Sequence, residues 1–129
     1  MMSAIGSRDT RPELLVRRYL HGAGLRFKLH DKSLPGTPDI VLPKFDSVIF
    51  VHGCFWHRHS GCRFAAIPAT RTEFWSSKFT SNVNRDAGNG QALRALGWRV
   101  FTIWECEASN ELILDQCVWL VMSGLDQAA

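Results

Sequence analysis

The spacing of hydrophobic and polar residues predicts a helix near the start of the chain. Thr10 has the chemistry of a helix cap, Pro12 fits a first helical turn, and Glu13 completes a capping box. Apolar residues then recur at helical spacing as far as Leu20, and Gly22 ends the segment.

Four later segments have the character of strands. Residues 25–29 alternate between apolar and polar, as a half-buried strand does. A proline-glycine turn at 35–38 leads into two short apolar runs, 39–42 and 47–51. Residues 98–104 form the last strand.

Helical patterns return over residues 72–96 and 110–122, although Gly88-Asn89-Gly90 weakens the middle of the first. The expected order is α-β-β-β-α-β-α, which implies a mixed β-sheet flanked by helices in an α/β fold. Loops at the strand ends of such sheets usually carry the chemistry.

Composition narrows the class of protein. The chain has 129 residues, so we expect a single domain over 1–129. No apolar run reaches the roughly 18 residues of a membrane span, and the first ten residues lack the apolar region of a signal peptide. We therefore expect a cytoplasmic protein without a membrane partner. A net charge of +3 permits nucleic-acid binding without requiring it.

Cysteine and histidine are concentrated in the stretch VHGCFWHRHSGC, residues 51–62. Two disulfides would require an oxidising compartment, so a metal site is the better interpretation. Cys54 and Cys62 supply two ligands, and Cys106 follows a strand and is free to reach them. The spacing alone does not choose between His57 and His59 as the fourth ligand.

We favour His59, because it leaves Phe55 and Trp56 on a wider loop. Four Cys and His ligands would make a closed, structural zinc site. Cys117 lies on the apolar face of the last helix and is expected to be a small core residue.

Four stretches resemble the very-short-patch-repair DNA mismatch endonucleases: PGTPDIVL, VIFVHGCFWHRH, IPATRTEFW and LGWRVFTIWEC. The similarity runs from about residue 2 to residue 107. It implies a restriction-endonuclease-like core and an enzyme that nicks DNA beside a T:G mismatch left by deamination of 5-methylcytosine.

The resemblance also implies a catalytic magnesium ion, held by Asp39 and by the backbone carbonyl of Val51. Carboxylate and carbonyl oxygens are ligands that magnesium prefers. The family usually has threonine where Val51 stands. From the residues alone, Asp39 could equally cap a turn.

By the same resemblance, His57 is the general base, His52 its partner near the phosphate, and Glu13 a carboxylate that orients a histidine. The alternatives are loop histidines or a zinc ligand, and for Glu13 a helix-capping role alone.

The family further implies DNA contacts. The aromatic rings of Phe55, Trp56 and Trp75 would enter the base stack from the major groove. Lys78 and Asn82 would approach the mismatched bases. Met2 and Ile5 would reach the minor groove. Arg8, Arg11, Arg71 and Arg85 are candidate phosphate contacts. Plain core packing is the alternative for the aromatics, and it suits Trp98 and Trp104 best.

Together these expectations describe a monomeric, magnesium-dependent nicking endonuclease with a structural zinc ion. Its partner would be double-stranded DNA with a T:G mismatch, with mismatch-repair proteins as further candidates. The alternative is a zinc-stabilised DNA-binding module without catalysis, which Asp39 lying far from His52 would favour.

Overall fold

The computed structural model describes residues 9–127. Its longer elements are α2 (Arg11–Gly22), β1 (Lys28–Leu29), β2 (Ile40–Leu42), β3 (Ser47–His52), α3 (Cys54–His57), α4 (Thr72–Ala95), β4 (Arg99–Trp104) and α5 (Glu111–Ser123). Single 3-10 turns lie at Pro43–Phe45, Arg63–Ala65 and Glu105–Glu107. Within this part of the chain, no helix has the length and apolar character needed to cross a membrane.

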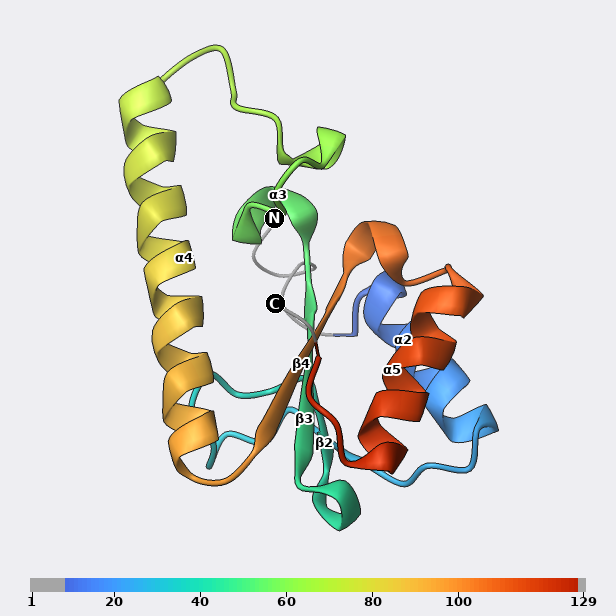
Figure 1. The fold of residues 1–129 in the computed structure, drawn as a ribbon. Coiled ribbons are helices and arrows are strands. Elements are labelled where there is room, and N and C mark those ends of the chain that lie inside the picture. Colours follow the sequence, from blue (N-terminus) through green and yellow to red (C-terminus); the bar gives the residue numbers. More distant parts are fainter. Residues whose placement is uncertain (1–8, 128–129) are drawn as a thin grey trace.

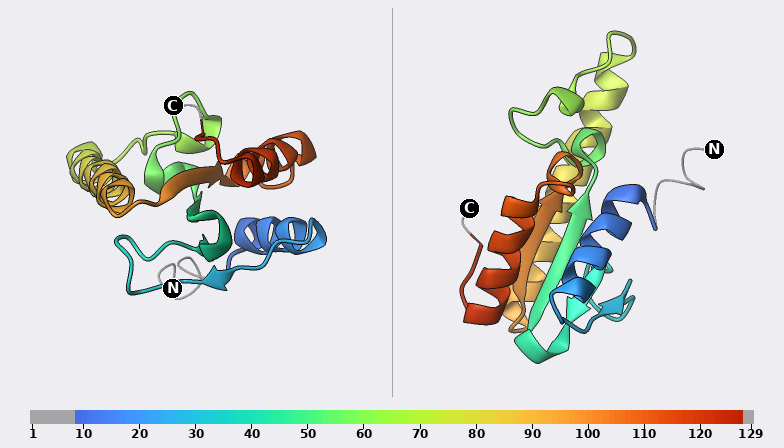
Figure 2. Two further views of the ribbon diagram at one scale, coloured as in Figure 1. Left: turned by 60° about the horizontal axis from the view of Figure 1, so that its bottom comes forward. Right: turned by 90° about the vertical axis from the view of Figure 1, so that its right-hand side faces the viewer.

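The four strands form one mixed sheet in the order β1-β2-β3-β4. Pairing is antiparallel between β1 and β2 and between β2 and β3, but parallel between β3 and β4. Helix α4 covers one face of the sheet, while α2 and α5 cover the other (Figures 1 and 2). The predicted mixed sheet flanked by helices is therefore confirmed.

Each face of the sheet has its own apolar cluster. Ile49 and Val51 of β3 belong to the larger cluster, beneath α2 and α5, whereas Val48 and Phe50 belong to the smaller one, which includes Leu93 of α4. Successive side chains of a strand alternate between faces. The last residue of β3, His52, therefore lies on the α4 side.

Two elements differ from the sequence-based expectation. Strand β1 pairs only at Lys28 and Leu29, with Val41 and Ile40 of β2, rather than over 25–29. Helix α4 is continuous through 88–90. Its Asn89 packs directly on Gly36, where an added Cβ would lie 2.8 Å from Asn89 Nδ2, so tertiary packing outweighs the low helix propensity of this segment.

Candidate active site and metal cluster

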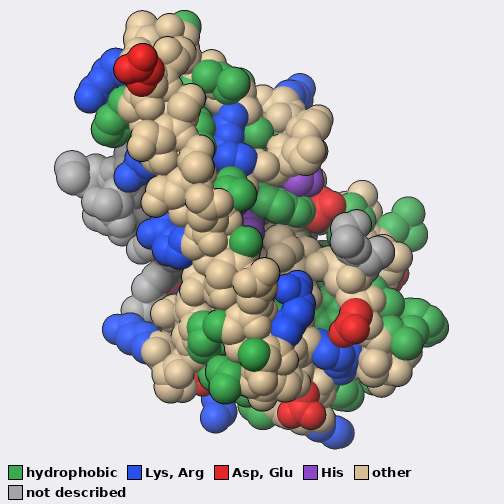
Figure 3. Space-filling model, turned by 60° about the vertical axis from the view of Figure 1, so that its left-hand side comes forward, with side chains coloured by type: hydrophobic (Ala, Val, Ile, Leu, Met, Phe, Trp, Pro, Cys, Tyr) green, Lys and Arg blue, Asp and Glu red, His purple; other side chains and the backbone are tan. Residues whose placement is uncertain are grey.

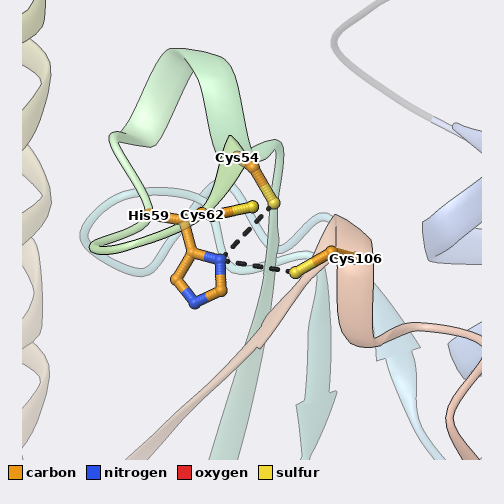
Figure 4. A group of neighbouring side chains, drawn as sticks. All are labelled: Cys54, His59, Cys62 and Cys106. Carbon is orange, nitrogen blue, oxygen red and sulfur yellow. Dashed lines mark hydrogen bonds between the residues drawn. The ribbon is translucent and has the colours of Figure 1, made fainter. Parts of the chain in front are cut away.

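Three cysteines and one histidine meet at the end of the sheet where β3 and β4 finish (Figure 4). The ligand atoms of Cys54, His59, Cys62 and Cys106 all lie within 4.8 Å of one another. His59 Nδ1 is 3.6 Å from Cys54 Sγ and 3.4 Å from Cys106 Sγ. Tetrahedral zinc with ordinary bond lengths separates a sulfur from a nitrogen ligand by roughly 3.6 Å. The donor set and spacing therefore fit a zinc ion.

Local backbone geometry separates the two histidines of this loop. Cys54 opens the one-turn helix α3, and Arg58 directly after it has a left-handed φ of 57°. The chain reverses there, so His59 joins the cysteines while His57 contacts Asp86 of α4 instead. The predicted ligand set is the set that the structure brings together.

Cys117 lies apart from this cluster, in the core beneath α5, as expected. Burial raises the pKa of its thiol to about 12. Because only thiolate is strongly nucleophilic, Cys117 should react with a thiol reagent only when the protein unfolds.

This difference gives a prediction for metal removal. After chelation of the folded protein, we expect iodoacetamide to modify Cys62 and Cys106, which are not buried, and to modify Cys117 at least about tenfold more slowly, because burial suppresses its thiolate. Cys54 should also react slowly, because burial raises its pKa to about 12 as well. Peptide mass mapping of the alkylated protein measures this. Equal rates at all four cysteines would contradict the assignment.

A cleft of about 1250 Å³ extends from the metal cluster along the face of the sheet that α4 covers. Its lining includes all five residues expected to take part in catalysis or magnesium binding: Glu13, Asp39, Val51, His52 and His57. The structure thus gathers residues from α2, β3, α3 and the approach to β2 into one cavity.

Asp39 is held on the wall of this cleft by the backbone of β3. Its Oδ2 accepts a hydrogen bond of 2.7 Å from the Val51 N–H. The pKa of the Asp39 carboxyl is raised to about 6, mainly by burial and also by the charge of Glu13, while the hydrogen bond from Val51 opposes the increase. A buried carboxylate with a second one nearby is poorly compensated, so a divalent cation fits here.

The two histidines of the cleft form a stacked pair. The rings of His52 and His57 are 3.9 Å apart and nearly parallel. Burial, assisted by the charge of His57, lowers the pKa of His52 to about 4, so His52 is neutral at pH 7. His57 Nδ1 lies 2.6 Å from Asp86 Oδ2, so Asp86 joins the candidate site, although it was not predicted from the sequence. Burial opposes ionisation of Asp86, but its hydrogen bond to His57 lowers its pKa overall.

Trp104 connects the histidine pair with the metal cluster. It is paired with His52 across the parallel strands, and their rings meet edge to face at 5.3 Å. On its other side it stacks on His59 at 4.3 Å. Trp104 was expected to serve core packing; it is instead partly exposed and lies between a metal-ligand candidate and the cleft.

Glu13 caps its helix only in part. Its backbone N–H contacts Thr10 Oγ1 at 3.4 Å, as predicted. The side chain does not return to Thr10; Glu13 Oε2 contacts Arg17 and lies 2.6 Å from Nε2 of His30. The histidine in contact with Glu13 is therefore His30, which was not predicted from the sequence.

The aromatic residues of the metal loop form a cluster with α4. The ring of Phe55 meets the rings of Trp56, Trp75 and Phe79 at 4.9, 5.7 and 5.2 Å. Phe55 and Trp56 are half-buried rather than sealed in the core, and both line the cleft. Asn82 Nδ2 donates to the Trp56 carbonyl, so Asn82 supports this loop in the free protein.

The remaining expected DNA contacts lie along α4, at Arg11 at the start of α2, or beyond the described residues. Lys78 is exposed, as are Arg71 and Arg85. Lys and Arg side chains are visible along this side of the molecule (Figure 3). Met2, Ile5 and Arg8 lie outside the residues that the structure describes.

Comparison with solved structures defines the class of fold. The catalytic domain of homing endonuclease I-Bth0305I matches with a TM-score of 0.63 at 21% sequence identity, covering 92% of this chain and 100% of that domain. The mixed sheet with its helices is thus an endonuclease-type α/β fold.

Sequence comparisons define the family. The family model for DNA mismatch endonuclease Vsr matches residues 1–63. The type II nicking enzyme V.XorIIP of Xanthomonas oryzae pv. oryzae is 52% identical over 110 residues, which is 85% of this chain and 80% of that protein. DNA mismatch endonuclease Vsr of Escherichia coli is 50% identical over 105 residues, 81% of this chain and 67% of the relative. The chain belongs to the Vsr family of DNA endonucleases.

Proposed function

We propose that this protein is a magnesium-dependent endonuclease that nicks one strand of DNA on the 5′ side of the mispaired thymine in a T:G mismatch. This cut would start very short patch repair of deaminated 5-methylcytosine. The protein would act as a monomer in the cytoplasm, with mismatch-repair proteins as further candidate partners. The resemblance to Vsr and to the nicking enzymes supports the activity.

The proposed magnesium site consists of Asp39 and the backbone carbonyl of Val51, with water and the scissile phosphate completing the shell. Bound magnesium would polarise the phosphate and stabilise the leaving oxygen. The Val51 N–H fixes one carboxylate oxygen of Asp39, so that the carboxylate faces the cleft in one orientation. A carbonyl ligand does not depend on the side chain, so valine in place of threonine is compatible with this site.

His57 is the proposed general base. If its Nδ1–H donates to Asp86, the imidazole is held in the tautomer whose Nε2 can accept a proton from the attacking water. His52 stacks on His57, and its lowered pKa keeps it uncharged. We assign His52 the role of holding His57 against the cleft wall and contacting the phosphate.

The aromatic cluster is the proposed wedge for the mismatch. Phe55, Trp56 and Trp75 contact one another, and Phe55 and Trp56 line the cleft, so the same rings can move from their own cluster into the base stack. Unstacking a base step costs roughly a few kcal/mol, and a mismatch lowers that cost. This difference supports selectivity for T:G over paired duplex.

Basic residues of α4 suit the phosphate backbone. Arg71, directly before α4, and Arg85 within it are both exposed. We propose that they position the duplex without reading its sequence, together with Arg11 at the start of α2. Lys78 and Asn82 lie one turn apart and are the proposed neighbours of the mismatched bases.

One observation carries the catalytic proposal: Asp39 and the His57–Asp86 pair line the same cleft as the aromatic cluster. A DNA-binding module without catalysis would have no use for a buried, poorly compensated carboxylate beside two histidines. The proximity of Asp39 to β3 therefore disfavours that alternative.

The test compares duplexes of identical sequence that contain either T:G or C:G at one position. With magnesium, we expect a single nick beside the thymine of the T:G duplex, at least about a hundredfold faster than any cut in the C:G duplex. Denaturing electrophoresis with each strand labelled in turn measures both rate and strand. Equal cutting of the two duplexes would refute mismatch direction, and cutting of both strands would refute nicking.

A further inference from the structure

His30 contacts both residues that place a carboxylate in the cleft. Its Nε2 lies 2.6 Å from Glu13 Oε2 in α2, and its backbone N–H donates to the Asp39 carbonyl at 3.1 Å. The imidazole is nearly enclosed, with 6% of the side chain exposed, and it lines the cleft. A single residue between β1 and the loop that follows it thus connects two acidic residues that are 26 positions apart.

The backbone at His30 has an uncommon conformation. Its φ of 48° lies in the left-handed region, which residues with a Cβ adopt rarely. The chain leaves β1 at this point, immediately after Leu29 pairs with Ile40. A left-handed residue that is also hydrogen-bonded at both its backbone and its ring is held in place by its surroundings, and such residues gather at functional sites.

Glu13 needs a fixed position because its charge acts on Asp39. Only 2% of Glu13 is exposed, and its negative charge raises the pKa of the Asp39 carboxyl. The two acidic groups would move apart if nothing restrained them. His30 contacts both residues, Glu13 through its ring and Asp39 through its backbone.

Asp9, Glu13 and His30 also have the composition of a cation site. Arg17 argues against that interpretation, because its guanidinium contacts both Asp9 and Glu13. A fixed positive charge already neutralises these carboxylates. The role of His30 is therefore to position Glu13 rather than to bind a metal itself.

We propose that His30 is a positioning residue of the active site, which holds the Glu13 carboxylate in place beside the Asp39 backbone so that the Asp39 carboxylate keeps one orientation toward the divalent cation. This inference rests on the proposed magnesium site. Partners that orient the groups around a metal typically change affinity or activity by roughly 10–100-fold when removed. The same range is expected here.

The test uses two substitutions of His30 and one control. His30→Leu removes the donor, whereas the side-chain amide of His30→Gln can replace Nε2–H. His21→Leu changes an exposed histidine at the end of α2 and should behave as wild type. Binding of Mn²⁺ to the zinc-loaded, DNA-free protein is measured by electron paramagnetic resonance. Nicking is measured at saturating DNA and magnesium.

We expect His30→Leu to weaken Mn²⁺ binding by about tenfold and to lower the nicking rate by roughly 10–100-fold. Its KM for DNA should be nearly unchanged. His30→Gln should remain close to wild type in both measurements. In a Glu13→Gln background, His30→Leu should have little further effect, because the two residues act as one unit. Wild-type Mn²⁺ affinity in His30→Leu, or additive losses in the double variant, would overturn the proposal. Wild-type protein that binds Mn²⁺ without nicking would refute the proposed function alone.

Discussion

The Asp39→Asn variant is expected to lose nicking by on the order of a thousandfold or more and yet to be more stable than wild type. The amide oxygen of asparagine can still accept the hydrogen bond from the Val51 N–H, so the local structure is retained. What disappears is the negative charge that binds the divalent ion. The same charge is costly in the free protein, because the fold buries it near Glu13.

The sign of the stability change follows from the pKa of Asp39. Folding raises this pKa from an ordinary value of 3.8 to about 6, so the folded state holds its proton more tightly than the unfolded state. Stability of the wild type therefore falls as pH rises through this interval, by up to about 3 kcal/mol, and the asparagine variant lacks this loss. The advantage of the variant should be full above about pH 6 and should vanish near pH 4.

Urea unfolding of zinc-loaded protein without magnesium, at about pH 5 and about pH 7.5, measures this difference. Asp46→Asn is the matched control, because Asp46 is exposed beside the 3-10 turn at Pro43–Phe45, away from the cleft. It should leave both nicking and the pH dependence unchanged. An Asp39→Asn variant that nicks normally would remove Asp39 from the magnesium site, and one that is less stable at pH 7.5 would contradict the burial argument.

The sequence predicted best where a short-range pattern determines the structure. The apolar run at 47–51 and the strand pattern at 98–104 located β3 and β4, and the Cys/His spacing located the metal cluster. The continuous course of α4 could not be foreseen, because it depends on Gly36 making room for Asn89 from far along the chain. Local helix propensity contains no information about that contact.

Asp86 can be recognised as a candidate site residue from the periodicity of α4. Phe79, Val83, Asp86, Gly90 and Leu93 follow a 4-3-4-3 spacing along α4, and all except Asp86 are apolar or glycine. An acidic residue in the stripe that faces the sheet signals a polar partner there. His30 offered no such signal, because its contacts with Glu13 and Asp39 depend on the left-handed turn after β1. A pattern of residue types does not reveal that turn.

Removal of the metal from the cysteine cluster is expected to lower nicking by about a hundredfold or more, although none of its four ligands is assigned to the reaction. His59 stacks on Trp104, Trp104 meets the edge of His52, and His52 stacks on His57. Without the metal, His59 and the Cys54–His57 turn lose their anchor. His57, the proposed general base, then loses the ring of His52 against which it is held.

The effect should be local rather than a loss of the whole fold. The larger apolar cluster, beneath α2 and α5, contains none of the four ligands, so the sheet and these helices should persist. Far-ultraviolet circular dichroism and nicking are measured after treatment with a chelator that removes zinc but leaves millimolar magnesium free. Cys117→Ala is the control, since it removes a core thiol and should retain the metal. If the chelated protein keeps its secondary structure and nicks at the wild-type rate, the metal does not support the histidine pair. Activity that is lost on chelation and restored by added zinc is the expected result, with the stack of rings from His59 to His57 as the physical link between the metal and the histidine pair.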